Sequence, residues 1–325
     1  MEENIDISIC VITYNHESFV SRAFESINCQ NFSGTIEVII GVDLSSDKTA
    51  ELVQELNAIS RFPTQLIINT ERRGMFGNLR DVLSLAKGKY IAMLEGDDFW
   101  YDPLKLEKQF NYLEGHANCV ATGGGILALT DKIKSTKKWN NKRDQYYYAD
   151  DLIHANRLSF CTVMFRKSAF QMSKYDLLQD SPHLDWPIYL SLFDDKKENY
   201  IKVFADVFSV YRIHQGGVFS GVDAEKRKNN VLKTMQYVLL MAKEPIAESY
   251  VQATVKYQTN RAAACPTPKQ LCREFGMPKT SVPSFYLYNF RKRQIVGALL
   301  KNPVFLFQLF GMMKRKFARR YRTPQ

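Results

Sequence analysis

The N-terminal hundred residues alternate between two hydrophobic periods, and this alternation restricts the chain to a small set of folds. Residues 7–12 form a continuous apolar run typical of a buried strand, and residues 19–27 place their apolar side chains on one helical face. A second strand at residues 36–40 precedes a helix through residues 52–56. Asp47 is the expected N-terminal cap of that helix.

The same pattern then repeats. A third strand is expected at residues 65–68, a helix through residues 79–86 ends before Gly88, and residues 90–94 form a fourth strand. Strands that alternate with helices at this spacing predict an α/β fold whose parallel sheet is wound by right-handed crossovers.

Polar side chains follow each of the four predicted strands directly. Open parallel sheets bind ligands beyond the carboxyl ends of their strands, so we expect these side chains to share one site. Phosphate-binding glycine loops of the usual spacing are missing, and the glycines of residues 123–125 are interpreted as a turn or a close backbone approach. The candidate side chains are Thr13, Tyr14, Asp43, Arg72, Arg73, Glu95, Asp97 and Asp98.

The rest of the chain is mixed and then helical. Residues 159–166 predict a further strand, and residues 199–212 contain a second apolar run. Helical spacing begins near residue 220 and is clearest in residues 230–242 and 250–264.

Composition excludes several classes for the chain of 325 residues. With 45% hydrophobic residues it can bury a full core, which excludes a disordered chain or a small disulfide scaffold. The six cysteines form no C-x-x-C pair, and the first ten residues lack the pattern of a secretory signal. We therefore expect a reducing, cytoplasmic compartment.

The net charge of +10 comes from the C-terminal segment. Eleven of the 44 basic residues follow Glu274, which is the last acidic residue, so the preceding residues carry 33 basic against 34 acidic side chains. A basic nucleic-acid-binding protein would carry its charge across the folded body. We therefore expect no nucleic-acid partner, and any polyanionic surface should meet the tail.

Glu95, Asp97 and Asp98 lie within four residues at a predicted strand end. Carboxylates this close repel one another unless a cation compensates them, and a hard divalent ion accepts oxygen ligands and bridges to phosphates. The alternative is a solvated acidic turn before a helix that Asp102 caps. The sequence alone leaves both interpretations open.

Three blocks of the sequence resemble a known family. Residues 7–30 (ISICVITYNHESFVSRAFESINCQ), 36–53 (IEVIIGVDLSSDKTAELV) and 88–109 (GKYIAMLEGDDFWYDPLKLEKQ) resemble the start of inverting family 2 glycosyltransferases. Residues 184–192 (LDWPIYLSL) and 210–217 (VYRIHQGG) are similar to the catalytic-base segment and closing motif of bacterial polysaccharide transferases in that family. The resemblance covers about residues 5–220 and implies the GT-A nucleotide-diphospho-sugar transferase fold.

The resemblance implies a nucleotide site. Tyr14 is similar to the aromatic that stacks on the base, Thr13 contacts the nucleotide beside it, and Asp43 resembles the carboxylate that binds the base or ribose. The family often has a second acidic residue in that turn, where this chain has Val42, so base specificity is less secure. Arg73 either approaches the base or diphosphate or is a plain surface arginine.

The resemblance also implies a metal site and a catalytic base. Asp97 and Asp98 would bind ribose and a Mn²⁺ or Mg²⁺ ion, with Glu95 in support where the family usually has aspartate. Asp185 would be the general base of a direct displacement at the anomeric carbon, with Asp180 as the rival candidate.

Three further residues join the predicted site. Trp186 would wall the sugar pocket or pack in the core. Arg212 and His214, which share one face of a predicted strand, would contact the diphosphate or the metal, although a histidine beside two glycines is often structural.

The basic tail predicts a membrane contact. Residues 304–313 are apolar and rich in phenylalanine, and basic clusters flank them at residues 291–293, 314–316 and 319–322. The apolar run is too short to cross a bilayer, but it is suited to lying among anionic headgroups. The alternative is a C-terminal helix packed on the catalytic domain.

Together these features predict two regions, a catalytic domain of residues 1–220 and a helical region of residues 221–325. The expected function is metal-dependent inverting transfer from a nucleotide sugar, UDP-linked by family habit, to a saccharide or lipid-linked acceptor in surface polysaccharide synthesis. The protein would act peripherally on the inner face of the cell membrane. A nucleotidyltransferase and a non-enzymatic basic binding protein are the alternatives.

Overall fold

The computed structural model describes residues 4–130, 136–139, 141–153, 156–193 and 198–241. The expected helix at residues 250–264 and the basic tail lie outside the described residues. Within the described residues no helix has the length and apolarity needed to cross a bilayer.

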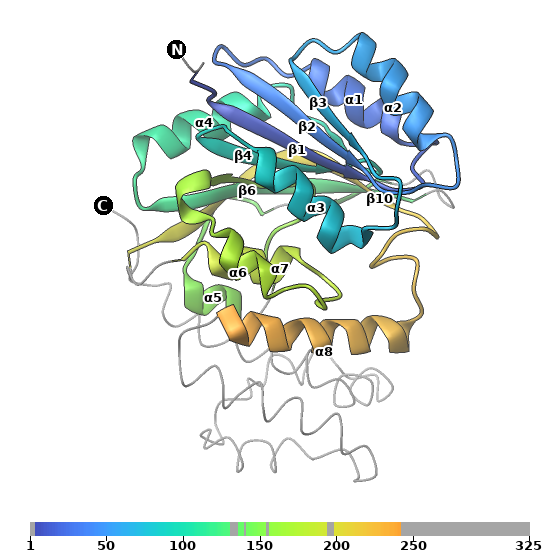
Figure 1. Ribbon diagram of the computed structural model, residues 1–325. Helices are drawn as coiled ribbons and strands as arrows, with labels where there is room; N and C mark the ends of the chain where they lie inside the picture. Colours follow the sequence, from blue (N-terminus) through green and yellow to red (C-terminus); the bar gives the residue numbers. More distant parts are fainter. Residues whose placement is uncertain (1–3, 131–135, 140, 154–155, 194–197, 242–325) are drawn as a thin grey trace, which may run out of the picture.

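One mixed sheet forms the centre of the molecule (Figure 1). Its strand order is β3-β2-β1-β4-β9-β6-β10-β5, with β7 paired to β6 and β8 paired to β10. The strands are β1 (Ile7–Thr13), β2 (Ile36–Val42), β3 (Thr64–Ile68), β4 (Tyr90–Glu95), β5 (Phe99–Trp100), β6 (Cys119–Thr130), β7 (Thr136–Trp139), β8 (Gln145–Tyr147), β9 (Met164–Arg166) and β10 (Tyr200–Ile213).

The predicted parallel sheet is confirmed for the first four long strands. β1 pairs in parallel with β2 and with β4, and β2 pairs in parallel with β3. β9 is antiparallel to both β4 and β6, whereas β10 runs parallel to β6. The carboxyl ends of β1, β2, β4 and β10 therefore meet at one edge, where the sequence places its polar clusters.

Helices cover both faces of the sheet. They are α1 (Val20–Asn28), α2 (Thr49–Ala58), α3 (Gly74–Leu85), α4 (Lys105–Gly115), α5 (Ala149–Ile153), α6 (Met172–Asp176), α7 (Asp185–Ser191) and α8 (Ala224–Met241), with short 3₁₀ turns η2 (Phe160–Thr162) and η3 (Lys167–Ala169). In Figure 1, α3 and the group α5 to α8 lie apart from α1 and α2 across the sheet.

Two hydrophobic cores follow from the alternation of side chains along each strand. In β1, Ile9 and Val11 face the core that contains α1, α2 and α4, whereas Cys10 and Ile12 face the core that contains α3, α7 and α8. The strands are apolar on both faces because helices bury both faces. This explains why they appear in the sequence as unbroken apolar runs.

The structure corrects three local expectations. The strand expected at residues 159–166 is a strand only in β9, because residues 160–162 form the turn η2. The glycines of residues 123–125 lie inside β6, not in a turn, and a Cβ on Gly124 would lie 2.4 Å from Phe208 Cδ2. α2 begins at Thr49. Asp47 lies one position before the N-terminal cap of this helix and accepts a hydrogen bond from the main-chain N–H of Thr49.

The boundary expected at residue 220 falls inside the packed unit. α8 follows it directly, and its Met235 and Val238 are fully buried in the core that also contains Trp186 of α7. The described part of the C-terminal region therefore packs on the catalytic domain, with α8 against α7 (Figure 1).

Candidate active site

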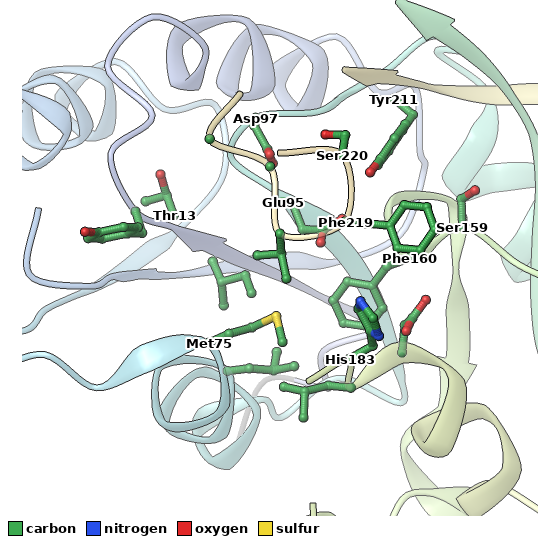
Figure 2. Close-up of a pocket in the computed structure, with 18 of the residues that line it drawn as sticks. Thr13, Met75, Glu95, Asp97, Ser159, Phe160, His183, Tyr211, Phe219 and Ser220 are labelled. Atoms are coloured by element: carbon green, nitrogen blue, oxygen red, sulfur yellow. The ribbon is translucent and has the colours of Figure 1, made fainter. Parts of the chain in front are cut away.

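A cavity of about 700 Å³ opens at the carboxyl ends of the parallel strands. Residues from β1, β2, β4, β10 and the segments before α3 and α7 line it, so it gathers side chains from across the chain. Figure 2 shows Thr13 on one side of this cavity, Glu95 and Asp97 in its middle, and Phe160 and His183 on the other side.

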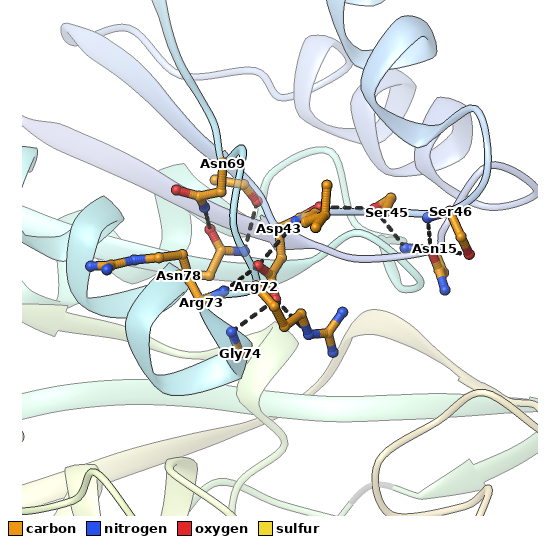
Figure 3. A network of polar contacts seen from close by, with 11 residues as sticks. Asn15, Asp43, Ser45, Ser46, Asn69, Arg72, Arg73, Gly74 and Asn78 are labelled. Atoms are coloured by element: carbon orange, nitrogen blue, oxygen red, sulfur yellow. Dashed lines mark hydrogen bonds and ion pairs between the residues drawn. The ribbon is translucent and has the colours of Figure 1, made fainter.

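Asp43, Arg72 and Tyr14 form one end of the cavity. Asp43 is 2% exposed, and its oxygens accept hydrogen bonds from the main-chain N–H groups of Arg73 (2.8 Å) and Gly74 (2.9 Å). The Arg72 guanidinium pairs with Asp43 at 3.2 Å and lies 3.3 Å from the ring centroid of Tyr14. Asp43 thus holds the start of α3 (Figure 3) and positions Arg72, whose guanidinium lies on the face of Tyr14.

The arginine that lines the cavity is Arg72 rather than the expected Arg73. Arg73 makes two 3.1 Å hydrogen bonds to Asp81 on the outside of α3, and its side chain is not among those lining the cavity. Gly74 has a φ of +66°, a backbone conformation that glycine adopts without strain. The turn before α3 therefore directs the two neighbouring arginines in different directions.

The three carboxylates of the acidic turn after β4 lie in different surroundings. Glu95 and Asp97 line the cavity, whereas Asp98 is 1% exposed and does not. Asp98 Oδ1 accepts a 2.8 Å hydrogen bond from the main-chain N–H of Arg212, and its Oδ2 is buried without a partner among the described residues. Contrary to the expectation that it binds metal or ribose, Asp98 joins the turn to β10.

Burial sets the protonation of this turn. It raises the pKa of Glu95 well above the usual range, and the charges of Asp98, Asp97 and Asp185 add to the effect. Burial likewise raises the pKa of Asp98, with Asp97 adding to it. For Asp97, burial is outweighed by the hydrogen bond from His214 and the charge of His16, which together lower its pKa. Asp97 is therefore the ionised carboxylate of the group.

Arg212 and His214 support this turn from β10. Arg212 Nη1 donates to the main-chain carbonyl of Asp97 at 2.7 Å, and its guanidinium lies near the rings of Phe19 and Phe99. His214 Nε2 lies 3.0 Å from Asp97 Oδ2. Neither side chain lines the cavity, so both act on it through Asp97.

The residues around Asp97 fit a divalent ion in part. No group of three or more His, Cys, Asp or Glu side chains in the described ranges is placed to hold a metal by itself. Buried polar atoms nevertheless remain free beside the turn, because Thr13 Oγ1 and His16 Nδ1 have no described partner. A Cβ on Gly96 would lie 2.6 Å and 3.0 Å from these two atoms, so glycine keeps the space open.

Mg²⁺ commonly binds through one or two carboxylates and completes its ligands with substrate phosphates. Asp97 with Glu95 supplies such a partial set, and carboxylate oxygens suit Mn²⁺ as well as Mg²⁺. The donor set is thus compatible with an ion that arrives together with a diphosphate.

Asp185 is the first residue of α7 and lines the same cavity. Asn156 Nδ2 donates a 2.6 Å hydrogen bond to its Oδ2, and burial raises its pKa. Asp180, the rival candidate, is exposed and does not line the cavity. Trp186 lines the cavity, and its buried Nε1 donates to the main-chain carbonyl of Leu152.

Sequence reasoning missed several lining residues. His16 lies two residues after Tyr14 and was within reach of the same motif, whereas Arg72 was a candidate by its position after a strand but was given no role. Asn156, His183 and Phe219 carry no local pattern that marks them. They reach the cavity only because the segments before α7 and α8 fold back over the strand ends.

Comparison with known proteins agrees with this site. The sequence model described as glycosyl transferase family 2 matches residues 8–172, which is half of the chain. An uncharacterized protein of Mycobacterium tuberculosis is 30% identical over 229 residues, which are 68% of this chain and 63% of that relative. The chain therefore spans less than two thirds of the length of this relative.

Two characterised proteins are more distant. The Escherichia coli protein named UDP-Glc:α-D-GlcNAc-diphosphoundecaprenol β-1,3-glucosyltransferase WfaP is 25% identical over 235 residues, 70% of this chain and 86% of the relative. The structure of mannosyltransferase PcManGT from Pyrobaculum calidifontis with GDP-Man and Mn²⁺ matches with a TM-score of 0.58 at 16% identity, covering 96% of this chain and 86% of that chain. At this identity the structural likeness shows the fold alone.

The family match begins in β1 and ends in α6, so it contains the ends of β1, β2 and β4 and the acidic turn. The fold is that of GT-A glycosyltransferases, as the sequence predicts. This chain belongs to glycosyl transferase family 2.

Proposed function

We propose that this protein transfers a sugar from a nucleotide-diphospho-sugar to a saccharide hydroxyl with inversion at the anomeric carbon. One observation carries the proposal: the half-buried carboxylate of Asp185 shares a single cavity with the acidic turn of Glu95 and Asp97 and with the aromatic end at Tyr14. A displacement reaction needs these three parts, namely a base for the attacking hydroxyl, a site for the leaving diphosphate and a site for the nucleotide.

In the proposed reaction Asp185 takes the proton of the acceptor hydroxyl while its oxygen bonds to the anomeric carbon. The bond from that carbon to the diphosphate oxygen breaks, and the nucleoside diphosphate leaves with the bonding electrons. A raised pKa makes Asp185 a stronger base than an ordinary aspartate. Asn156 orients the carboxylate by its hydrogen bond to Oδ2.

Tyr14, Thr13 and Arg72 would bind the nucleotide, and Asp43 would fix Arg72 and the turn before α3. Asp97 with Glu95 would hold a Mn²⁺ or Mg²⁺ ion, whose charge would stabilise the departing diphosphate. Arg212 and His214 would keep Asp97 in place. Trp186 would wall the sugar pocket.

The donor is proposed to be UDP-linked and the acceptor lipid-linked. The alignment with WfaP covers 70% of this chain. The name of that relative gives UDP-Glc and a diphosphoundecaprenol-linked saccharide as its substrates. Together with the family match, this supports a role in surface polysaccharide synthesis, with the protein acting at the inner face of the cell membrane.

The basic tail is proposed to bind that membrane. Support comes from its charge, because residues 275–325 contain eleven basic and no acidic side chains, and from the phenylalanine-rich run between the basic clusters. The body of the chain is close to neutral, so we propose no nucleic-acid partner.

A donor-hydrolysis assay over a panel of UDP-, GDP- and dTDP-sugars, with Mn²⁺, Mg²⁺ or chelator, tests the proposal. We expect one UDP-sugar to be turned over, activity to vanish in chelator, and Asp97→Ala to lose most activity in Mn²⁺. Glu55→Ala, at an exposed position of α2 outside the cavity, is the matched acidic control and should keep wild-type activity. Full activity in chelator would contradict the proposed metal dependence. Absence of turnover with every nucleotide sugar would contradict the proposed glycosyl transfer.

A further inference from the structure

His183 lines the cavity two residues before Asp185, on the side opposite Thr13 (Figure 2). Its Nδ1 lies 3.0 Å from the Thr234 hydroxyl of α8. Its Nε2 is buried and has no hydrogen-bond partner among the described residues. One ring nitrogen is therefore anchored to a helix, and the other has an unused hydrogen-bonding position.

The partner of Nδ1 determines which nitrogen carries the proton. The Thr234 hydroxyl is buried and donates its single proton to the main-chain carbonyl of Asn230 at 2.9 Å, a bond to the preceding helical turn. It can then only accept from His183, which places the ring proton on Nδ1. Burial lowers the pKa of His183 despite the nearby charge of Asp185, so the ring stays neutral and Nε2 is a hydrogen-bond acceptor.

A buried acceptor without a partner is rare in folded proteins and calls for a ligand or water. Two aromatic rings lie on the His183 side of the cavity wall. Phe219 packs edge-on against His183 with ring centroids 5.7 Å apart, and Phe160 lies on the same side of the cavity in Figure 2. A single acceptor among rings suits a sugar, whose C–H faces contact aromatic rings while its hydroxyls donate.

The side chain of Phe219 is placed to give access to Nε2. It is 46% exposed, and Gly216, Gly217 and Gly221 flank it. Arg227 of α8 holds the same segment by donating to the main-chain carbonyl of Phe219 at 2.9 Å. Because His183 Nε2 is buried, a ligand hydroxyl would reach it only if this ring moved.

We propose that His183 binds the acceptor saccharide, with Nε2 accepting a hydrogen bond from an acceptor hydroxyl in the tautomer that Thr234 sets. This rests on the proposed glycosyl transfer and assigns the acceptor to the end of the cavity away from Tyr14. Asp185, between His183 and the acidic turn, then meets the attacking hydroxyl of the same saccharide.

The kinetic test compares His183→Leu with His183→Gln, because glutamine keeps an acceptor oxygen at the end of a chain of similar length. The probes are GlcNAc-, GalNAc- and glucose-diphosphoundecaprenol as acceptors with the UDP-sugar that the enzyme hydrolyses. We expect His183→Leu to raise the KM for the acceptor roughly 3- to 10-fold while the KM for the donor stays within 2-fold. His183→Gln should recover most of the loss.

Equal changes in both KM values, or no change in the acceptor KM, would overturn the assignment of His183. Failure of the wild-type enzyme to transfer to any of the three probes while it hydrolyses a UDP-sugar would overturn the saccharide-lipid acceptor for this end of the cavity. Absence of all donor turnover would instead overturn the proposed function.

A spectroscopic test is independent of turnover. In ¹⁵N-histidine-labelled protein at neutral pH, the His183 nitrogens should show a protonated Nδ1 and a bare Nε2. Thr234→Val, which is isosteric and removes only the hydroxyl, should shift the tautomer toward Nε2–H and raise the acceptor KM. A protonated Nε2 in the wild-type protein would overturn the inference whatever the assays show.

Discussion

Asp185 depends on its surroundings at the level of single atoms. Burial raises the pKa of its carboxyl, whereas hydrogen bonds from its own helix and from Asn156 lower it, and burial wins. The side chain is therefore a stronger base than an ordinary aspartate.

Replacing Asp185 by asparagine should keep the shape of the site and remove the base. We expect turnover to fall by roughly 100-fold or more, with donor affinity little changed. Asp180→Asn is the matched control because Asp180 is exposed outside the cavity, and it should behave as wild type. Steady-state kinetics would contradict the assignment if the two variants exchanged these effects.

The raised pKa of Asp185 also predicts the acid limb of the pH profile. The proton must leave Asp185 before it can act as a base, so activity rises with pH through this pKa. The midpoint of this rise should lie above the pKa of an ordinary aspartate, which is about 3.9. A profile of kcat/KM that is already flat at pH 4 would exclude Asp185 as the group that titrates.

Arg72 and Arg73 offer a second matched pair. Arg72→Ala should weaken UDP binding by roughly 10-fold, because a charged group at the nucleotide end of the cavity is lost. Arg73→Ala removes only an ion pair with Asp81 on the outside of α3 and should change binding less than 2-fold. Calorimetric titration with UDP separates them, and an equal loss in both would refute the placement of the cavity arginine.

At the scale of elements, α4 places a lysine side chain in the core. Lys105 in its first turn is fully buried, donates to Gln109 at 2.8 Å and lies 4.2 Å from the Trp100 ring. Burial lowers the pKa of Lys105 to about 7. Gln109 in turn donates to Thr122 of β6, so the helix and the sheet behind the acidic turn share one polar chain.

This pKa makes stability depend on pH in a defined direction. Between about pH 7 and 10.5 the unfolded Lys105 holds its proton and the folded one does not, so Lys105 makes the free energy of unfolding rise by roughly 1 kcal/mol per pH unit. Denaturant titrations of Lys105→Met should lack this rise. Lys108→Met is the control from the same helix and should retain it, and identical slopes in Lys105→Met and wild type would refute the buried, neutral lysine.

At the scale of the molecule, the described fold is a catalytic body with α8 packed beneath α7, and the predicted membrane tail lies outside the described residues. Deleting residues 291–325 removes ten of the eleven basic residues after Glu274 and none of the proposed site residues. We therefore expect donor hydrolysis to persist while binding to vesicles with anionic lipid is lost.

Salt should weaken vesicle binding of the full chain only in part. Charge attraction is screened within about 10 Å at 0.1 M ionic strength, whereas the contact of phenylalanine side chains with the lipid does not depend on charge. Cosedimentation with vesicles of phosphatidylglycerol and phosphatidylcholine measures both effects. Failure of the full chain to bind at low salt, or unfolding of the truncated body, would show that the tail is a packed structural element.

Local sequence was sufficient for the elements at the N-terminal side. The strands β1, β2 and β4 are apolar on both faces and each is followed by polar residues, so period and position alone predict the sheet and the edge where the site lies. These features depend on neighbours within a few residues. Asp185 became a candidate through the resemblance of residues 184–192 to the catalytic-base segment of family 2 glycosyltransferases, not through a local pattern.

Only the tertiary structure decided which side chains enter the cavity. Asp98 turns away because it bonds the main chain of Arg212, 114 residues later, and His183 is oriented by Thr234, 51 residues later. Arg72 and Arg73 differ because Asp43 of another strand holds the turn between them. A side chain takes the direction that satisfies its buried polar atoms, and those partners come from chain segments that no local pattern connects.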